Sequence, residues 1–130
     1  MKNDFDSSLP IYIQIIGVIK KQIVSGERNP GQKVEPVREM AQKMGVNPNT
    51  IQKAFAELER EGLMYSERTS GRYITGDTGL ISKIREETAG KCIENFVSQM
   101  NRSGFDRNDI LRLVENYLRG VDNHGESCGG

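Results

Sequence analysis

Five polar side chains lie within one short segment near the middle of the chain: Asn47, Asn49, Thr50, Gln52 and Lys53. Asparagine and glutamine amides match the hydrogen-bonding edge of adenine, and threonine can bind a base edge or contact a thymine methyl group. Lysine pairs with phosphate. A cluster of these residue types therefore predicts noncovalent recognition of DNA.

Two helices joined by a tight turn would present these side chains. We expect helices over residues 36–44 and 47–61, with Gly45 ending the first. Asn47 suits the N-cap of the second helix and Pro48 its first helical position, so Asn47 can cap, contact DNA, or do both. The apolar face of the second helix would be buried through Ile51, Ala54, Phe55, Leu58 and the following Leu63.

A third helix and a hairpin would complete this unit. Apolar residues recur at helical spacing over residues 10–25, and two short strands are expected at 64–67 and 72–75. Three helices followed by a hairpin are the pattern of a winged helix-turn-helix. Arg38 would face the same DNA backbone as the polar cluster, and the hairpin tip, with Ser70, Gly71 and Arg72, is either a DNA-contacting wing or an ordinary turn.

Two further helices are expected at about 80–101 and 106–120, the second with Asp106 as its N-cap. Their apolar stripe is broader than one helical hairpin can bury, so we predict that two copies of the chain pack through it as a homodimer. The alternative is that the stripe packs on the winged helix of its own chain. The predicted interface residues are Ile81, Ile84, Cys92, Phe96, Val97, Ile110, Leu111, Val114 and Leu118.

Composition is consistent with a DNA-binding module attached to a second element. The net charge is zero, but residues 10–75 hold ten Lys/Arg and seven Asp/Glu, whereas residues 76–130 hold seven and nine. This asymmetry places the positive charge on the part with the polar cluster. No apolar run could span a membrane and the N-terminus lacks a signal-peptide core, so we expect a cytoplasmic protein.

Catalysis is not expected. The only histidine, His124, lies near the C-terminus, and no serine or cysteine is paired with a base by a recognisable pattern. No glycine-rich phosphate loop is present. Cys92 and Cys128 are too few for a disulfide scaffold or a zinc site, and we expect no metal or cofactor. We interpret Cys92 as a small core residue.

The domain organisation follows from these elements. We predict a disordered N-terminus at residues 1–9, a winged helix-turn-helix at 10–76, a helical dimerisation region at 77–120 and a flexible tail at 121–130. The fold class is mainly α with a small β-hairpin.

Six short motifs lie along the first half of the chain: Pro10-Ile11-Tyr12-x-Gln14, Val24-x-Gly26, Pro30-Gly31, Val37-Arg38-Glu39-Met40-Ala41, Gly45-Val46-Asn47-Pro48-Asn49-Thr50 and Leu58-Glu59-Arg60-Glu61-Gly62-Leu63. By these motifs the first half of the chain resembles the DNA-binding domain of the GntR family of bacterial transcription regulators, most closely its YtrA-type group. The resemblance implies DNA contacts by Arg38, by residues 47–50, by Gln52 or Lys53, and by Gly71. It also implies a dimer that represses an operon of the transporter type.

The chain departs from this family pattern just before Val37. The family usually has Leu-Pro-Ser there, whereas this chain has Val34-Glu35-Pro36. The serine that would cap the next helix is absent, and we expect Glu35 to place a negative charge near the DNA-facing surface. The hypothesis from the residues and the resemblance together is a sequence-specific regulator that binds double-stranded DNA as a two-fold symmetric dimer. The alternative is a winged-helix adaptor that binds proteins.

Overall fold

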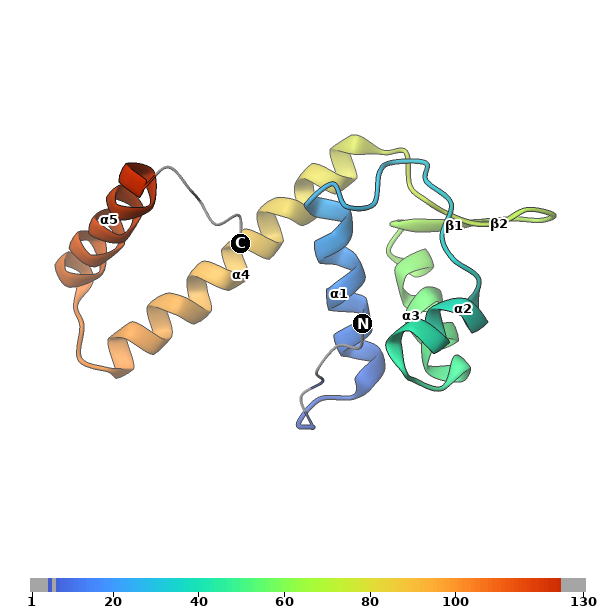
Figure 1. The fold of residues 1–130 in the computed structure, drawn as a ribbon, viewed down its shortest axis with the longest axis horizontal. Helices are drawn as coiled ribbons and strands as arrows, with labels where there is room; N and C mark the ends of the chain where they lie inside the picture. The colour runs from blue at the N-terminus through green and yellow to red at the C-terminus, as the bar shows by residue number, and fades with distance from the viewer. Residues whose placement is uncertain (1–4, 6, 125–130) are drawn as a thin grey trace. The chain divides into compact units, whose positions relative to one another are not determined.

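The computed structural model describes residue 5 and residues 7–124, which form five helices and one hairpin (Figure 1). The elements in chain order are α1 (Ile11–Val24), α2 (Val37–Met44), α3 (Pro48–Arg60), β1 (Met64–Glu67), β2 (Gly71–Ile74), α4 (Thr78–Arg102) and α5 (Arg107–His124). One compact unit extends to Thr88 and a second begins at Ala89. Each predicted helix and strand is present, and the mainly helical fold class is confirmed.

The core of the first unit is built around α3, against which α1, α2 and β1 pack. The expected inward face of α3 is fully buried. Isoleucines of α1 and methionines of α2 meet it, because each helix carries its apolar residues on one face. The side chains with no measurable exposure are Ile15, Ile19, Ile51, Ala54, Phe55, Leu58, Leu63 and Ile74.

The turn between α2 and α3 has the geometry that its sequence predicts. Gly45 adopts a left-handed conformation with φ of 70°, which a side chain would disfavour. The Val46 N–H donates to the Ala41 carbonyl at 3.0 Å, so the last turn of α2 is closed by the backbone. This turn brings the start of α3 directly after the end of α2.

The hairpin β1–β2 is antiparallel, with Tyr65 opposite Tyr73 and their rings stacked at 5.7 Å. Residues 31–34, in the connector between α1 and α2, pair with the other edge of β2. The Val34 N–H donates to the Arg72 carbonyl, and the Ile74 N–H donates to the Gln32 carbonyl, both at 2.9 Å. The hairpin is therefore tied to the connector between α1 and α2.

Helix α4 begins two residues before the expected position, and Asp77 caps it by accepting a hydrogen bond from the Leu80 N–H at 3.0 Å. Its first turns belong to the first unit. Ile84 lies in the core cluster, and Leu80 and Ile81 pack against that cluster. Ile81 and Ile84, both predicted to belong to a dimer interface, thus pack on the core of their own chain, and their part in an interface stays a prediction.

The second unit consists of the rest of α4 and α5. Asp106 is the N-cap of α5, as predicted, and Asp109 makes the cap reciprocal, since the N–H of each donates to the carboxylate of the other at 2.9 and 3.0 Å. Helix α5 continues to His124, four residues beyond the expected end near Gly120. Residues 121–124 of the predicted flexible tail therefore belong to α5, and residues 125–130 lie outside the described residues.

Two expectations about single side chains also change. Phe5, placed in the predicted disordered segment, is half-buried against the core. Cys92, interpreted as a core residue, is exposed on α4, and Cys128 lies outside the described residues. None of the helices in the described part of the chain is long and apolar enough to cross a membrane.

Candidate nucleic-acid interface

The N-terminal turn of α3 is capped by its own sequence. The Asn47 side chain accepts a hydrogen bond from the Asn49 N–H at 2.7 Å, and Pro48 occupies the first helical position. Such a cap satisfies one of the unpaired amides at the helix start and fixes the direction of the chain entering the helix. The expected capping role of Asn47 is confirmed, and its contact with DNA stays a prediction.

The other members of the polar cluster lie on the surface of the same helix. Asn49, Gln52 and Lys53 are exposed and Thr50 is half-buried, whereas the apolar positions between them are buried. Arg38 is exposed in the first turn of α2. A helix end that presents amides, a hydroxyl and an ammonium group in this way can reach base edges and phosphates in a major groove.

Lys53 is not a free cation. Its Nζ lies over the ring of Tyr12, 4.2 Å from the ring centroid. Ile11 and Tyr12 of α1 line an open cavity of about 420 Å³ together with Asn49, Thr50 and Lys53 of α3. The start of α1 therefore adjoins the polar turn of α3, a relation that the spacing of residues along the chain does not reveal.

The hairpin tip is braced against the rest of the unit. The Tyr73 hydroxyl donates to Ser70 Oγ at 2.9 Å, which restrains the tip next to the exposed Gly71. The Arg72 guanidinium donates to the Glu59 carboxylate at 2.9 Å and lies 5.2 Å from the centroid of the Phe55 ring. Arg72, proposed from sequence to contact DNA, thus joins the hairpin to α3, while Ser70 and Gly71 remain open to solvent.

We expect Gly71→Ala to destabilise the hairpin. Gly71 has φ of 117°, and an added Cβ would lie 3.3 Å from Cε of Lys33. The free energy of unfolding should fall by about 1–2 kcal/mol, because a left-handed conformation is unfavourable for a residue with a side chain. Denaturant unfolding would measure the change. Gly76→Ala is the matched control, since Gly76 is also exposed but its added Cβ meets no atom within 4 Å. Equal effects of the two substitutions would contradict this account.

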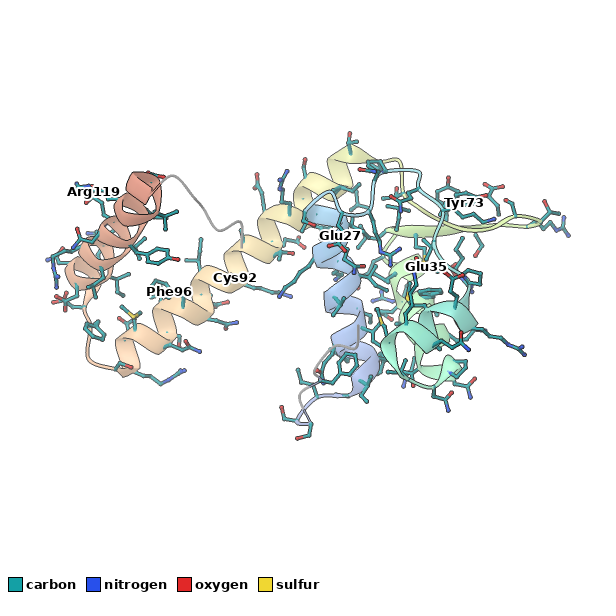
Figure 2. The ribbon with its side chains drawn as sticks, viewed as in Figure 1. Glu27, Glu35, Tyr73, Cys92, Phe96 and Arg119 are labelled. Atoms are coloured by element: carbon teal, nitrogen blue, oxygen red, sulfur yellow. The ribbon has the colours of Figure 1, made fainter. Side chains whose placement is uncertain are left out.

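A cluster of charged side chains fixes the start of α2. Arg28 is only 8% exposed and donates two hydrogen bonds to the Glu35 carboxylate, at 2.6 and 3.2 Å. Its Nε donates to Gln22 at 2.6 Å, and Lys43 reaches the same carboxylate at 3.3 Å. Figure 2 marks Glu35 beside α2.

The charge of Glu35 is therefore balanced within the protein. The hydrogen bonds from Arg28 are the main cause that lowers the pKa of Glu35 to about 2, and Lys43 adds to the effect. The negative charge that Glu35 was expected to place near the DNA-facing surface is thus paired with Arg28 and Lys43, and its effect on DNA binding stays a prediction. Sequence analysis did not single out Arg28, and the only signal for it was an acidic residue seven positions later.

Among residue 5 and residues 7–124, no group of three or more His, Cys, Asp and Glu side chains is placed to hold a metal ion. The fold and the exposed polar turn of α3 together define a winged helix-turn-helix protein of the DNA-binding class.

Comparison with known proteins gives the family. Residues 11–74 match the model of the bacterial regulatory proteins, gntR family. The chain is 36% identical to the uncharacterized HTH-type transcriptional regulator YhcF of Bacillus subtilis, over 92% of this chain and 99% of that protein. It is 48% identical to the HTH-type transcriptional repressor YtrA of Bacillus subtilis, over 62% of this chain and 67% of that protein. The chain therefore belongs to the GntR family.

Solved structures agree with this assignment. A GntR family transcriptional regulator from Listeria monocytogenes is similar with a TM-score of 0.79 and 41% identity, over 86% of this chain and 98% of that one. AraR(DBD) in complex with operator ORR3 is similar with a TM-score of 0.50 and 33% identity, over 58% of this chain and 88% of that one. The chain is thus a DNA-binding transcription regulator and a homologue of YtrA, and its relatives are regulators rather than enzymes.

Proposed function

We propose that this regulator is a homodimeric repressor that acts in the cytoplasm on a two-fold symmetric operator of a transporter-type operon. Two copies of α3 would enter successive major grooves about 34 Å apart, with the hairpins beside the adjacent backbone or minor groove. Bound protein would then block transcription. The similarity to YtrA, which is named as a repressor, supports repression rather than activation.

The observation that carries the proposal is that the polar start of α3 is exposed, whereas the apolar face of the same helix is buried. Ile51 and Phe55 are fully buried, and Asn49, Gln52 and Lys53 of the same helix are exposed. A protein-binding winged helix would need an apolar recognition surface, because buried apolar area supplies most of the affinity between proteins. This helix end offers hydrogen-bonding groups and positive charge instead, which match DNA.

The dimer is supported by the side chains of the second unit. Residues 89–122 contain one buried hydrophobic side chain, Ile110, whereas Ile93, Leu111, Tyr117 and Leu118 are each more than half exposed. The unit thus leaves apolar surface in water that a partner would remove from it. A second copy is the partner that a two-fold symmetric operator requires.

The proposed recognition surface is tested by DNA selection followed by substitution. Sequences bound by the protein are selected from random DNA, which gives the half-site and its spacing. Asn49→Ala should then lower affinity for the selected sequence by about tenfold, because it removes a base-contacting amide. Arg38→Ala should weaken binding to all sequences and reduce the slope of log K against log salt by about one unit.

The matched control is Asn101→Ala, which makes the same change at an exposed position of α4. Its affinity should equal that of the unmodified protein. If neither Asn49→Ala nor Arg38→Ala weakens binding, the recognition surface lies elsewhere. If selection yields no enriched sequence at any salt concentration, the adaptor function is favoured over a repressor.

A further inference from the structure

We propose that Tyr12 positions Lys53 for contact with a DNA phosphate, so that the start of α1 contributes to DNA binding. This inference rests on the proposed function, because Lys53 is one of the proposed DNA contacts. The structural observation behind it is the placement of the Lys53 ammonium group over the Tyr12 ring, 4.2 Å from the centroid.

The ring is the fixed partner in this contact. Tyr12 is half-buried and packs against the hydrophobic core of the first unit, whereas Lys53 is exposed on α3. An ammonium group within about 6 Å of an aromatic centroid is attracted by the negative face of the ring. The flexible lysine is therefore held by a ring that its own helix does not supply.

The surroundings of the contact favour an anion. The cavity of about 420 Å³ at this point is lined by Ile11 and Tyr12 on one side and by Asn49, Thr50 and Lys53 on the other. Lys53 is the one residue of this lining that carries a full charge. The neighbouring amide and hydroxyl can also bind phosphate oxygens, so the DNA backbone is the ligand that this chemistry fits.

Holding Lys53 in place should strengthen DNA binding through pre-organisation. A free lysine side chain loses rotamer freedom when it binds, and a side chain that is already restrained loses less. An ammonium group has three donors, so Nζ can stay over the ring while it donates to a phosphate. The strength of an exposed cation–π contact corresponds to about a two- to fivefold change in affinity.

The test is a double-mutant cycle in the full chain, with the selected DNA as ligand. The variants are Tyr12→Phe, Tyr12→Leu, Lys53→Met and the combined Tyr12→Leu/Lys53→Met. We expect Tyr12→Leu to raise Kd by about two- to fivefold and Tyr12→Phe to stay near the unmodified protein, because phenylalanine keeps the aromatic face. In the Lys53→Met background, Tyr12→Leu should have no further effect.

A second readout needs no DNA. The ε-methylene protons of Lys53 should resonate upfield in the NMR spectrum of the unmodified protein and of Tyr12→Phe, and should return to the usual lysine position in Tyr12→Leu. This chemical shift reports directly whether Lys53 lies over the ring. It therefore distinguishes loss of that contact from a general effect of the Tyr12 substitution on folding.

Three results would overturn the proposal: an equal loss for Tyr12→Phe and Tyr12→Leu, an undiminished effect of Tyr12→Leu without Lys53, or no effect of Lys53→Met on Kd. If Asn49→Ala still weakens binding in the last case, the proposed recognition surface stands and only the role of Tyr12 is lost. If Asn49→Ala and Arg38→Ala are also without effect, the proposed function itself has failed.

Discussion

Leu118→Glu is expected to convert the protein into a monomer and to lower its affinity for the two-fold operator by about a hundredfold or more. Leu111 and Leu118 are 55% and 54% exposed, and they lie seven residues apart on one face of α5, with the half-buried Val114 between them. Such spacing forms a continuous apolar seam along a helix. A glutamate in this seam would be buried without a partner in the proposed dimer.

The loss of affinity follows from the linkage of two binding sites. When two recognition helices are joined, the second binds at a high effective concentration, and overall affinity exceeds that of one helix by about two to four orders of magnitude. A monomer retains only the single contact. Leu118→Glu should therefore bind one isolated half-site as the unmodified protein does, although it binds the complete operator poorly.

Sedimentation at micromolar concentration would report the oligomeric state, and titration of full and half operators would report the two affinities. The matched control is Asn116→Glu, which introduces the same charge on α5 at an exposed position away from the seam. A dimeric Leu118→Glu protein, or a control that also dissociates, would refute the proposed interface.

An apolar groove between the two helices of the second unit adjoins this seam at Val114. Phe96 and Met100 of α4 line an apolar groove of about 250 Å³ with Leu113, Val114 and Tyr117 of α5. Figure 2 shows Phe96 on the side of α4 that faces α5. The two helices thus leave a gap that their own side chains do not fill, and apolar gaps cost stability because their lining atoms lack contacts.

The positions of the helices could be predicted because their ends are encoded locally. The caps Asn47 and Asp106 and the end residue Gly45 act within a few residues of their own helices, and each has the expected role. A residue that caps its own helix does so whatever lies elsewhere in the fold. The recognition surface was proposed in the same way, from residue types at one helix end.

Features that depend on distant partners could not be predicted. The apolar stripe of α4 is continuous in sequence, so its spacing does not reveal that Ile84 covers the core of the first unit while Phe96 lies in the second. The pairing of residues 31–34 with β2 joins segments about forty positions apart. The contact between Tyr12 and Lys53 spans a similar distance. Periodicity identifies which face is apolar but not which surface it meets.

Glu35→Gln is expected to lower the free energy of unfolding by about 2–3 kcal/mol near neutral pH. Glu35 is 21% exposed and Arg28 is 10% exposed at their side chains, and the substitution leaves the guanidinium without its counter-charge. Removing one member of a largely buried pair costs more than the pair contributes as a whole, because the remaining charge stays desolvated. Chemical denaturation at about pH 7 would measure the loss.

The matched control is Glu39→Gln, which removes a carboxylate of α2 that is 53% exposed and lies 3.6 Å from Lys43. This exposed pair should contribute less than about 0.5 kcal/mol. Equal destabilisation by the two substitutions would show that the Arg28 contact has no special role.

The dependence on pH gives an independent check. The pKa of Glu35 is lowered from 4.5 to about 2, so its stabilising contribution is complete above about pH 4.5 and is lost as the pH falls towards 2. The difference in unfolding free energy between the unmodified protein and Glu35→Gln should therefore be constant from about pH 7 to pH 5 and should shrink below that. A difference that stays constant down to about pH 2.5 would contradict the ion pair as its source.

The same variant distinguishes two roles of Glu35 in DNA binding. If the Glu35 carboxylate repelled DNA, its removal would raise the affinity for DNA. That affinity would then also depend less on the charged side chains around position 35. The structure instead has Arg28 and Lys43 on that carboxylate, directly before a helix whose N-cap, Pro36, makes no side-chain cap bond. The ion cluster thus holds the start of α2, and with it Arg38, in place of a capping side chain. We therefore expect the affinity of Glu35→Gln for the operator to be lower than that of the unmodified protein, and a higher affinity would restore the view of Glu35 as a repulsive charge.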